Sequence, residues 1–208
     1  MRTIDDIMAL APVVPVLVIE HVADARPVAE ALVAGGLPVL EVTLRTPAAL
    51  DVIREMTKVK GAVVGAGTVL NDRDLEASLK AGAQFIVSPG LTDTIGKAAI
   101  ASGIPFLPGI ATAADIMRGL DLGLNRFKFF PAMAAGGIPT LKALAAPFPQ
   151  CRFCPTGGIT QANAPDWLAL DAVTCVGGSW LVKPGSLDPA RIVAMARDAA
   201  GLAGSKMR

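Results

Sequence analysis

Residues 38–43 read Pro-Val-Leu-Glu-Val-Thr, a short run of apolar and β-branched residues that predicts a buried β-strand. Similar runs begin roughly 20–26 residues apart along the chain, the spacing of parallel strands joined by crossover helices. The eight predicted strands are residues 13–19, 38–43, 63–68, 84–88, 104–107, 126–130, 152–155 and 172–176. The sequence therefore predicts a repeated β–α unit.

Helix start signals lie between these runs. Thr46-Pro47 and Asp188-Pro189 each combine an N-cap residue with proline at the first helical position. Further N-caps are predicted at Asn71, Thr92 and Thr112, and alanine-rich helices over residues 22–33 and 189–200. This alternation favours an α/β fold, a single (β/α)8 TIM barrel over residues 1–208 with a short N-terminal helix. An open doubly wound sheet is the alternative, but no Gly-x-Gly-x-x-Gly motif follows the first strand.

Composition excludes several classes of protein. Of 208 residues, 52% are hydrophobic and the formal net charge is +1, so neither a nucleic-acid partner nor wholesale disorder is expected. The apolar N-terminal run, residues 8–19, is too short to span a membrane and is interrupted by Pro12 and Pro15. With His21 as the one histidine and no tyrosine, a histidine-based triad and a multi-histidine metal site are excluded.

Three cysteines do not form a disulfide framework. Cys151 and Cys154 make a Cys-x-x-Cys pair, but a zinc site wants a second such pair or nearby histidines. We therefore expect free thiols, no metal and no cofactor, and a reduced, cytoplasmic setting. Acid–base chemistry then falls to glutamate, aspartate, lysine or cysteine.

Side-chain alternation puts two ionisable residues inside the predicted barrel. Leu40 and Val42 share the face that suits the helix layer, so Glu41 faces inward, and Arg45 follows at the strand's carboxyl end. In residues 126–130 the phenylalanines Phe127 and Phe129 face the helices, which turns Lys128 inward.

An enclosed lysine has two interpretations. Apolar walls and the like charge of Arg45 lower the pKa of a lysine, and the neutral amine attacks carbonyls to form a Schiff base. Alternatively, Lys128 forms a buried ion pair with Glu41 or extends to a strand edge. The residues alone leave both open.

Glycine pairs follow the last two predicted strands. Gly157-Gly158 comes after residues 152–155, and Gly177-Gly178-Ser179 comes after residues 172–176. Glycines let backbone N–H groups approach an anion, and many barrels bind phosphate in the loops after strands seven and eight. We expect a phosphate site here, with plain turns as the alternative. Thr68 follows the third predicted strand and offers a hydroxyl at the same end of the predicted barrel. Ser88-Pro89-Gly90 is interpreted as a rigid turn.

These segments resemble a known family. Residues 36–45 (GLPVLEVTLR) and 123–132, with the run FKFFPA, resemble the signatures of the 2-keto-3-deoxy-6-phosphogluconate (KDPG) and 4-hydroxy-2-oxoglutarate (KHG) aldolases. Residues 64–70, 88–91, 153–159 and 177–181 also match, so the resemblance covers nearly the whole chain. One residue departs: family members often have glutamate where this chain has Met133.

The resemblance implies a metal-free class I aldolase of carbohydrate metabolism, in the Entner–Doudoroff pathway, that is a homotrimer. It implies that Lys128 forms the imine with pyruvate and that Glu41 is the general acid–base. The implied substrate-binding residues are Arg45, Thr68, Pro89 and Thr156. The implied phosphate-binding residues are Gly157, Gly158, Gly177, Gly178 and Ser179. The implied partners are a phosphorylated 2-keto acid and pyruvate, with no nucleic acid and no membrane.

Two other functions stay open at this point. One is a phosphosugar isomerase barrel in which Lys128 only pairs with charge. The other is a non-catalytic sugar-phosphate-binding barrel that keeps the glycines without turnover. The aldolase itself has further reactions to consider, namely cleavage of 4-hydroxy-2-oxoglutarate and decarboxylation of oxaloacetate.

Overall fold

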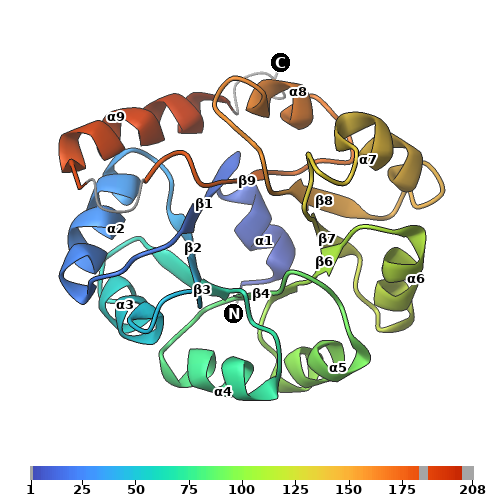
Figure 1. Ribbon diagram of the computed structural model, residues 1–208, viewed down its shortest axis with the longest axis horizontal. Coiled ribbons are helices and arrows are strands. Elements are labelled where there is room, and N and C mark those ends of the chain that lie inside the picture. Colours follow the sequence, from blue (N-terminus) through green and yellow to red (C-terminus); the bar gives the residue numbers. More distant parts are fainter. Residues whose placement is uncertain (1, 183–186, 203–208) are drawn as a thin grey trace.

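The computed structural model describes residues 2–182 and 187–202, which form a parallel α/β fold with helices arranged around a curled sheet (Figure 1). The strands are β1 (Val13–Leu17), β2 (Val39–Thr43), β3 (Val63–Gly67), β4 (Ile86–Val87), β5 (Phe106–Leu107), β6 (Gly109–Ile110), β7 (Arg126–Phe129), β8 (Arg152–Pro155) and β9 (Val176–Gly178). The helices are α1 (Ile4–Ala9), the 3-10 helix η1 (Val22–Asp24), α2 (Ala25–Ala34), α3 (Ala49–Met56), α4 (Asp72–Lys80), α5 (Asp93–Ser102), α6 (Ala113–Asp121), α7 (Gly137–Ala145), α8 (Ala164–Leu168) and α9 (Pro189–Ala200).

The strands form two parallel sheets that meet at two places. One sheet has the order β5-β4-β3-β2-β1-β9 and the other β6-β7-β8. Pro108 separates β5, which pairs with β4, from β6, which pairs with β7. At the other junction, an isolated parallel bridge joins Thr156, just after β8, to Gly177 of β9. The predicted β–α repeat is therefore confirmed, and the chain curls rather than spreading into an open doubly wound sheet.

Several predicted strands are shorter than expected or displaced. Of the run at residues 104–107, only Phe106–Leu107 is a strand, and the short strand β6 after it was not predicted. β5 pairs with β4 and β6 with β7, and the proline at position 108 between them has no N–H to donate to a ladder. The run at residues 172–176 is only partly a strand. Val173 forms an isolated parallel bridge to Phe153 of β8, and pairing with β1 begins only at β9, whose Val176 N donates to Pro12 O.

The helix caps were mostly predicted correctly. Asn71, Thr92, Thr112 and Asp188 each accept a hydrogen bond from a backbone N–H of the first helical turn, and α9 has the predicted bounds. The Thr46 cap is wrong, because α3 begins at Ala49 and the Thr46 hydroxyl donates to Ile19 O at 2.7 Å. The first turn of the helix predicted from residue 22 is the 3-10 helix η1.

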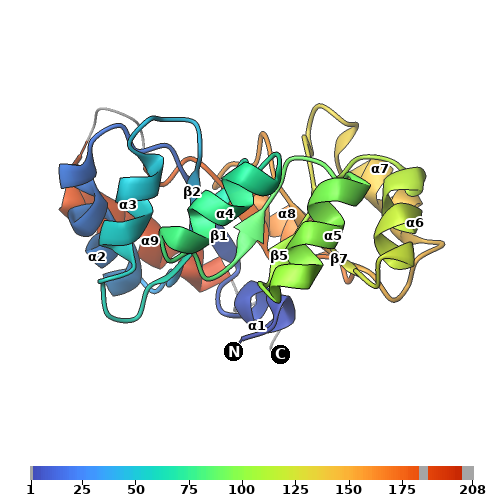
Figure 2. The same cartoon turned by 90° about the horizontal axis from the view of Figure 1, so that it is seen from below.

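Apolar side chains form two separate clusters. The larger one fills the space between the strands and the surrounding helices and includes Leu40, Val42 and Phe127. The smaller lies inside the curled sheet and includes Val14, Val39 and Val63, near the starts of their strands. Helix α1 covers this amino-terminal end, as Figure 2 shows, and buries Ile7 and Met8 in the inner cluster.

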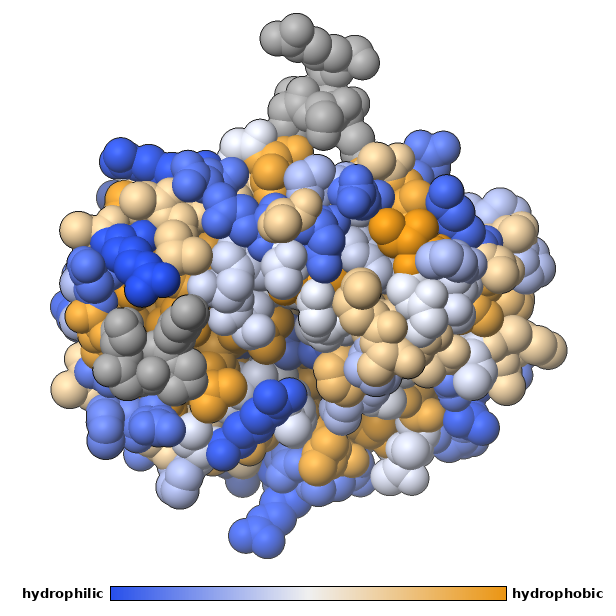
Figure 3. Space-filling view, turned by 45° about the horizontal axis from the view of Figure 1, so that its top comes forward, coloured by the Kyte–Doolittle hydropathy of each residue, from blue (hydrophilic) through white to orange (hydrophobic). Residues whose placement is uncertain are grey.

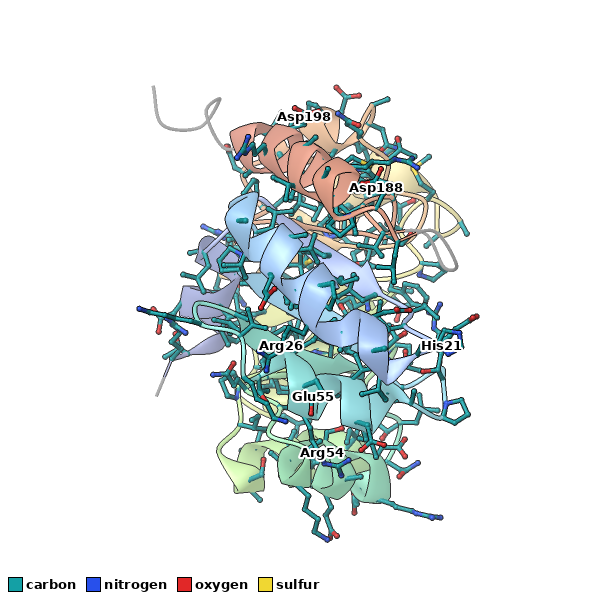
Figure 4. The ribbon with its side chains drawn as sticks, turned by 90° about the vertical axis from the view of Figure 1, so that its left-hand side faces the viewer. His21, Arg26, Arg54, Glu55, Asp188 and Asp198 are labelled. Atoms are coloured by element: carbon teal, nitrogen blue, oxygen red, sulfur yellow. The ribbon has the colours of Figure 1, made fainter. Side chains whose placement is uncertain are left out.

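The outer surface is mixed in character. Figure 3 shows hydrophilic and hydrophobic residues interspersed over one face of the molecule. Arg26, Arg54 and Asp198 lie on the outer sides of α2, α3 and α9, and His21 is exposed (Figure 4). Within residues 2–182 and 187–202, no helix combines the length and apolar character that crossing a membrane requires.

Candidate active site

Glu41 projects into the interior from β2. Its neighbours Leu40 and Val42 belong to the helix-facing core, as the alternation along the strand predicts. The carboxylate is 3% exposed. Space for it comes from Gly67 on the neighbouring strand β3, because a Cβ at that position would lie 2.3 Å from Glu41 Oε1. Gly65 and Gly67 lie within β3, and their lack of side chains makes room for Phe85 and Glu41.

Lys128 projects into the interior from β7. Phe127 and Phe129 face outward, where their rings lie 6.2 Å from Phe153 and 6.3 Å from Trp167. These large apolar contacts hold the phenylalanine face of β7 against the surrounding helices and strands. Lys128, which lies between the two phenylalanines, therefore points inward and is 5% exposed. The predicted orientation is confirmed.

The two ionisable side chains meet across the interior. Lys128 Nζ donates a hydrogen bond to Glu41 Oε1 at 3.0 Å, although the residues are 87 positions apart in the sequence. The ring of Phe130 lies 5.3 Å from the same nitrogen. The buried ion pair that the sequence left open is therefore formed. Burying two charges costs several kcal/mol per ion, which their attraction only partly offsets, so such a pair is typical of a functional site.

Further candidate residues follow the carboxyl ends of the parallel strands and so lie at one end of the sheet. Arg45 is exposed just beyond β2, and Pro89 is half-buried just beyond β4. Thr68, just beyond β3, has a φ of 62°. A β-branched residue is strained in this left-handed region, and such strain is concentrated at functional positions.

The glycine pairs lie side by side. The bridge between Thr156 and Gly177 joins the turn after β8 to β9. Gly157 and Gly158 have φ values of 102° and 75°, which glycine adopts without strain. Gly177 and Gly178 differ from the prediction, because they are the last residues of β9 rather than part of a turn.

Close packing accounts for both glycines of β9. A Cβ at Gly177 would lie 2.3 Å from the Thr156 hydroxyl, and one at Gly178 would lie 1.9 Å from the Trp180 ring. Ser179 follows them and is exposed. In the turn after β8, Met133 packs against Gly158, where a Cβ would lie 2.7 Å from the methionine Cγ.

The free thiols expected from the sequence are buried, and two of them lie inside the curled sheet. Cys154 and Cys175 belong to the inner cluster, whereas Cys151 belongs to the outer one, so the Cys-x-x-Cys pair faces opposite sides of β8. A hydrogen bond with Cys154, burial and the charge of Glu41 together raise the pKa of the Cys175 thiol well above its ordinary value of 9.0. All three cysteines are free, and in the described parts of the chain no three His, Cys, Asp or Glu side chains gather as metal ligands would.

Comparison with known proteins agrees with this arrangement. The family model described as KDPG and KHG aldolase matches residues 4–195. This chain belongs to the KDPG and KHG aldolase family. A 2-dehydro-3-deoxy-phosphogluconate aldolase of Zymomonas mobilis is 61% identical over 199 residues, covering 96% of each chain.

Solved structures of the family share the fold. The KDPG aldolase of Zymomonas mobilis with 3-phosphoglycerate has a TM-score of 0.95 and 60% identity, covering 97% of each chain. A KDPG aldolase from Legionella pneumophila, with pyruvate captured as a covalent carbinolamine intermediate, has a TM-score of 0.86 and 44% identity. It covers 97% of this chain and 96% of that one. The family resemblance of the sequence motifs is thereby confirmed.

Proposed function

We propose that this protein is a class I aldolase that cleaves KDPG to pyruvate and glyceraldehyde 3-phosphate through an imine on Lys128. The observation that carries the proposal is the enclosed amine of Lys128, 3.0 Å from the carboxylate of Glu41. The 61% identical protein of Zymomonas mobilis is named as an aldolase of this substrate, and the Legionella pneumophila structure holds pyruvate as a covalent carbinolamine; both support the proposal.

The proposed reaction begins at the amine. Glu41 accepts a proton from Nζ, the neutral amine adds to the C2 keto carbon of KDPG, and the carbinolamine loses water to give a protonated imine. The bond between C3 and C4 then breaks, and its electron pair moves toward the imine nitrogen. The C4 hydroxyl loses its proton as the aldehyde forms and leaves. Protonation of the remaining enamine at C3, followed by addition of water, releases pyruvate and restores the amine.

Glu41 serves each proton transfer in this sequence. Among the described residues, it is the one carboxylate within hydrogen-bonding distance of Nζ, and its side chain packs against Gly67 of β3. Positioned acid–base catalysis contributes typically about 10²–10⁴-fold in rate. Arg45 and Thr68 are proposed to bind the carboxylate of the keto acid, Pro89 to contact the same half, and Thr156 to contact the hydroxyl-bearing carbons.

The phosphate group is proposed to bind at Gly157, Gly158, Gly177, Gly178 and Ser179. The adjoining turns and the exposed Ser179 hydroxyl support this assignment, since backbone N–H groups and a hydroxyl are suitable phosphate ligands. The Zymomonas mobilis structure with 3-phosphoglycerate is a further support, because that ligand carries a phosphate on three carbons. The family description also supports cleavage of 4-hydroxy-2-oxoglutarate, and oxaloacetate decarboxylation uses the same imine chemistry.

The molecule's larger organisation is part of the proposal. We infer that β5 and β6 together occupy one position in an eight-stranded (β/α)8 barrel that forms a single domain over residues 1–208. The junctions at Pro108 and at the Thr156–Gly177 bridge support closure. A homotrimer is proposed on family membership, and sedimentation velocity measures it. The three free thiols support a reducing, cytoplasmic location.

Trapping with pyruvate and borohydride tests the proposal. Reduction of the imine is expected to leave a stable adduct that peptide mass spectrometry locates on Lys128. The Lys128→Ala variant forms none, and its KDPG cleavage falls at least about 10³-fold, since the covalent route is lost. Lys142→Ala is the matched control, because Lys142 is exposed on α7.

The alternatives predict other results. A phosphosugar isomerase interconverts its substrate without cleavage, and a binding protein holds phosphate ligands without turnover. Folded wild-type protein that gives no pyruvate adduct would overturn the aldolase proposal.

A further inference from the structure

Gly109, the first residue of β6, lies against the backbone of a neighbouring turn. A Cβ at this position would lie 2.1 Å from Pro89 O, 2.3 Å from Pro89 C and 2.7 Å from Gly90 N. These separations are far below van der Waals contact, and the obstructing atoms belong to a peptide group rather than to a flexible side chain. The peptide between Pro89 and Gly90 therefore occupies the space that any other residue at position 109 would need.

This peptide lies on the same side of the sheet as Lys128. Gly109 and Lys128 are register partners in the parallel pair β6–β7, and Lys128 N donates to Pro108 O at 2.8 Å. Paired residues of parallel strands project to the same face, and Lys128 projects to the interior. The missing side chain of Gly109 would also project inward, so the Pro89–Gly90 peptide forms part of the interior wall beside the lysine.

The turn that carries this peptide is held on both sides. Ser88 N donates to Leu107 O at 3.3 Å, and the Ser88 hydroxyl donates to Gly90 O within the turn. Beyond the turn, Arg118 Nη1 donates to Leu91 O at 3.2 Å. The turn is thus fastened to β5 at its start and to α6 at its end, so it cannot withdraw from Gly109 as a unit.

The strand on the other side is equally constrained. Besides the bond from Lys128 N, β6 accepts a hydrogen bond from Phe130 N to Ile110 O at 3.1 Å. A methyl group added at Gly109 must therefore displace either the Pro89–Gly90 peptide or the strand that pairs with Lys128. Both displacements change the surroundings of the amine.

We propose that Gly109 is a positioning residue of the keto-acid pocket, where its lack of a side chain lets the Pro89–Gly90 peptide lie beside Lys128. This inference rests on the proposed imine chemistry. The carbonyl and N–H of that peptide form a rigid polar wall that orients a keto acid for addition of the amine. Orientation of this kind is sensitive, since a misplacement of about 1 Å costs up to about 10²-fold in rate. Ser88 supports the same wall through its bond to Gly90 O.

The experiment measures trapping of pyruvate by cyanoborohydride over a range of pyruvate concentrations. In Gly109→Ala, we expect the pyruvate concentration for half-maximal trapping to rise about tenfold or more, with the adduct still on Lys128. Ser88→Ala removes one hydrogen bond within the turn and is expected to raise it about threefold. Circular dichroism and thermal melting check that each variant is folded.

Gly201→Ala is the matched control, because it adds the same methyl group at the C-cap of α9, where the described residues, its own helix and chain neighbours aside, place no heavy atom within 4 Å of the added Cβ. A purely structural role for Gly109 lowers the melting temperature but leaves half-saturation of the folded protein unchanged. That result in Gly109→Ala would overturn the inference. Where Gly109→Ala does not fold, wild-type half-saturation in Ser88→Ala overturns it. Absence of trapping in the wild type would instead overturn the proposed function.

Discussion

Two side chains carry the proposed chemistry at the residue scale, and the inward orientation of each was predicted from its strand. Glu41 stands between outward-facing Leu40 and Val42, and Lys128 stands between outward-facing phenylalanines. Alternation with a period of two is a local property of a strand, so these orientations follow from sequence. The 3.0 Å contact between Nζ and Oε1 does not, because it joins strands whose relative positions no local pattern determines.

Replacing Glu41 by glutamine tests its role in proton transfer. Glu41→Gln keeps the size of the side chain but cannot accept a proton, so turnover of KDPG is expected to fall by about 10²–10⁴-fold. Pyruvate binding, measured by trapping at equilibrium, changes much less. Steady-state rates and trapping together check this, and an unchanged turnover number would remove Glu41 from the mechanism.

Replacing Ser179 by alanine tests the phosphate assignment. Ser179→Ala loses one exposed hydroxyl beside the glycines of β9, and KM for KDPG is expected to rise about tenfold, the value of a hydrogen bond to a charged group. Kinetics with 4-hydroxy-2-oxoglutarate serve as the control, because that substrate has no phosphate group to bind the Ser179 hydroxyl. An equal loss with both substrates would contradict a phosphate role.

At the element scale, helix α1 closes the amino-terminal end of the sheet. Thr3 and Asp6 form a capping box that starts the helix, and Ile7 and Met8 are buried in the inner cluster. The Asp5 carboxylate also forms an ion pair with Arg126, the first residue of β7 and two positions before Lys128. The short helix thereby closes off the end of the interior opposite the candidate site.

Truncating Met8 tests how much the packing of α1 against the inner cluster contributes to the free energy of unfolding. Met8 is 2% exposed, so Met8→Ala is expected to lower the free energy of unfolding by about 2–5 kcal/mol through lost burial and a cavity. Met117→Ala is the control, because Met117 is 56% exposed on α6 and its loss is expected to cost less than about 0.5 kcal/mol. Urea denaturation measures both, and equal effects would show that α1 does not seal the interior.

The helix N-caps show which local sequence signals predict structure and which do not. Asn71 and Asp188 cap their helices as predicted, because an N-cap hydrogen bond needs only neighbouring residues. Thr46 has the same local signal, yet its hydroxyl bonds to Ile19 O after β1. The helix begins later, at Ala49 with Ala48 as its N-cap, and no pattern around residue 46 reveals the distant carbonyl that its hydroxyl reaches.

At the scale of the whole molecule, the buried thiol of Cys175 links stability to pH. Its pKa is raised in the folded protein, so the folded state favours the neutral thiol. The resulting stabilisation is fully present below the ordinary pKa of 9.0 and is lost as the pH rises toward the folded value.

We therefore expect the free energy of unfolding to decrease from about pH 8 to about pH 10, and to decrease less steeply in Cys175→Ala. Chemical denaturation at several pH values measures the two slopes. The comparison of slopes is independent of any loss that the variant shows at neutral pH. Equal slopes in the two proteins would show that Cys175 does not contribute to the alkaline limit.

The sequence by itself determined the β–α alternation, the inward direction of Glu41 and Lys128, and the glycine turn after β8. These features depend on periodicity and on neighbouring residues, which are local properties. Only the tertiary structure decided that the Glu41 carboxylate meets the Lys128 amine and that β5 and β6 are separate strands. It also decided that Cys154 and Cys175 lie in the same inner cluster, and that the Pro89–Gly90 peptide packs against Gly109. Each of these depends on how the sheet curls and which strands become neighbours, and that arrangement is set by packing of the whole chain.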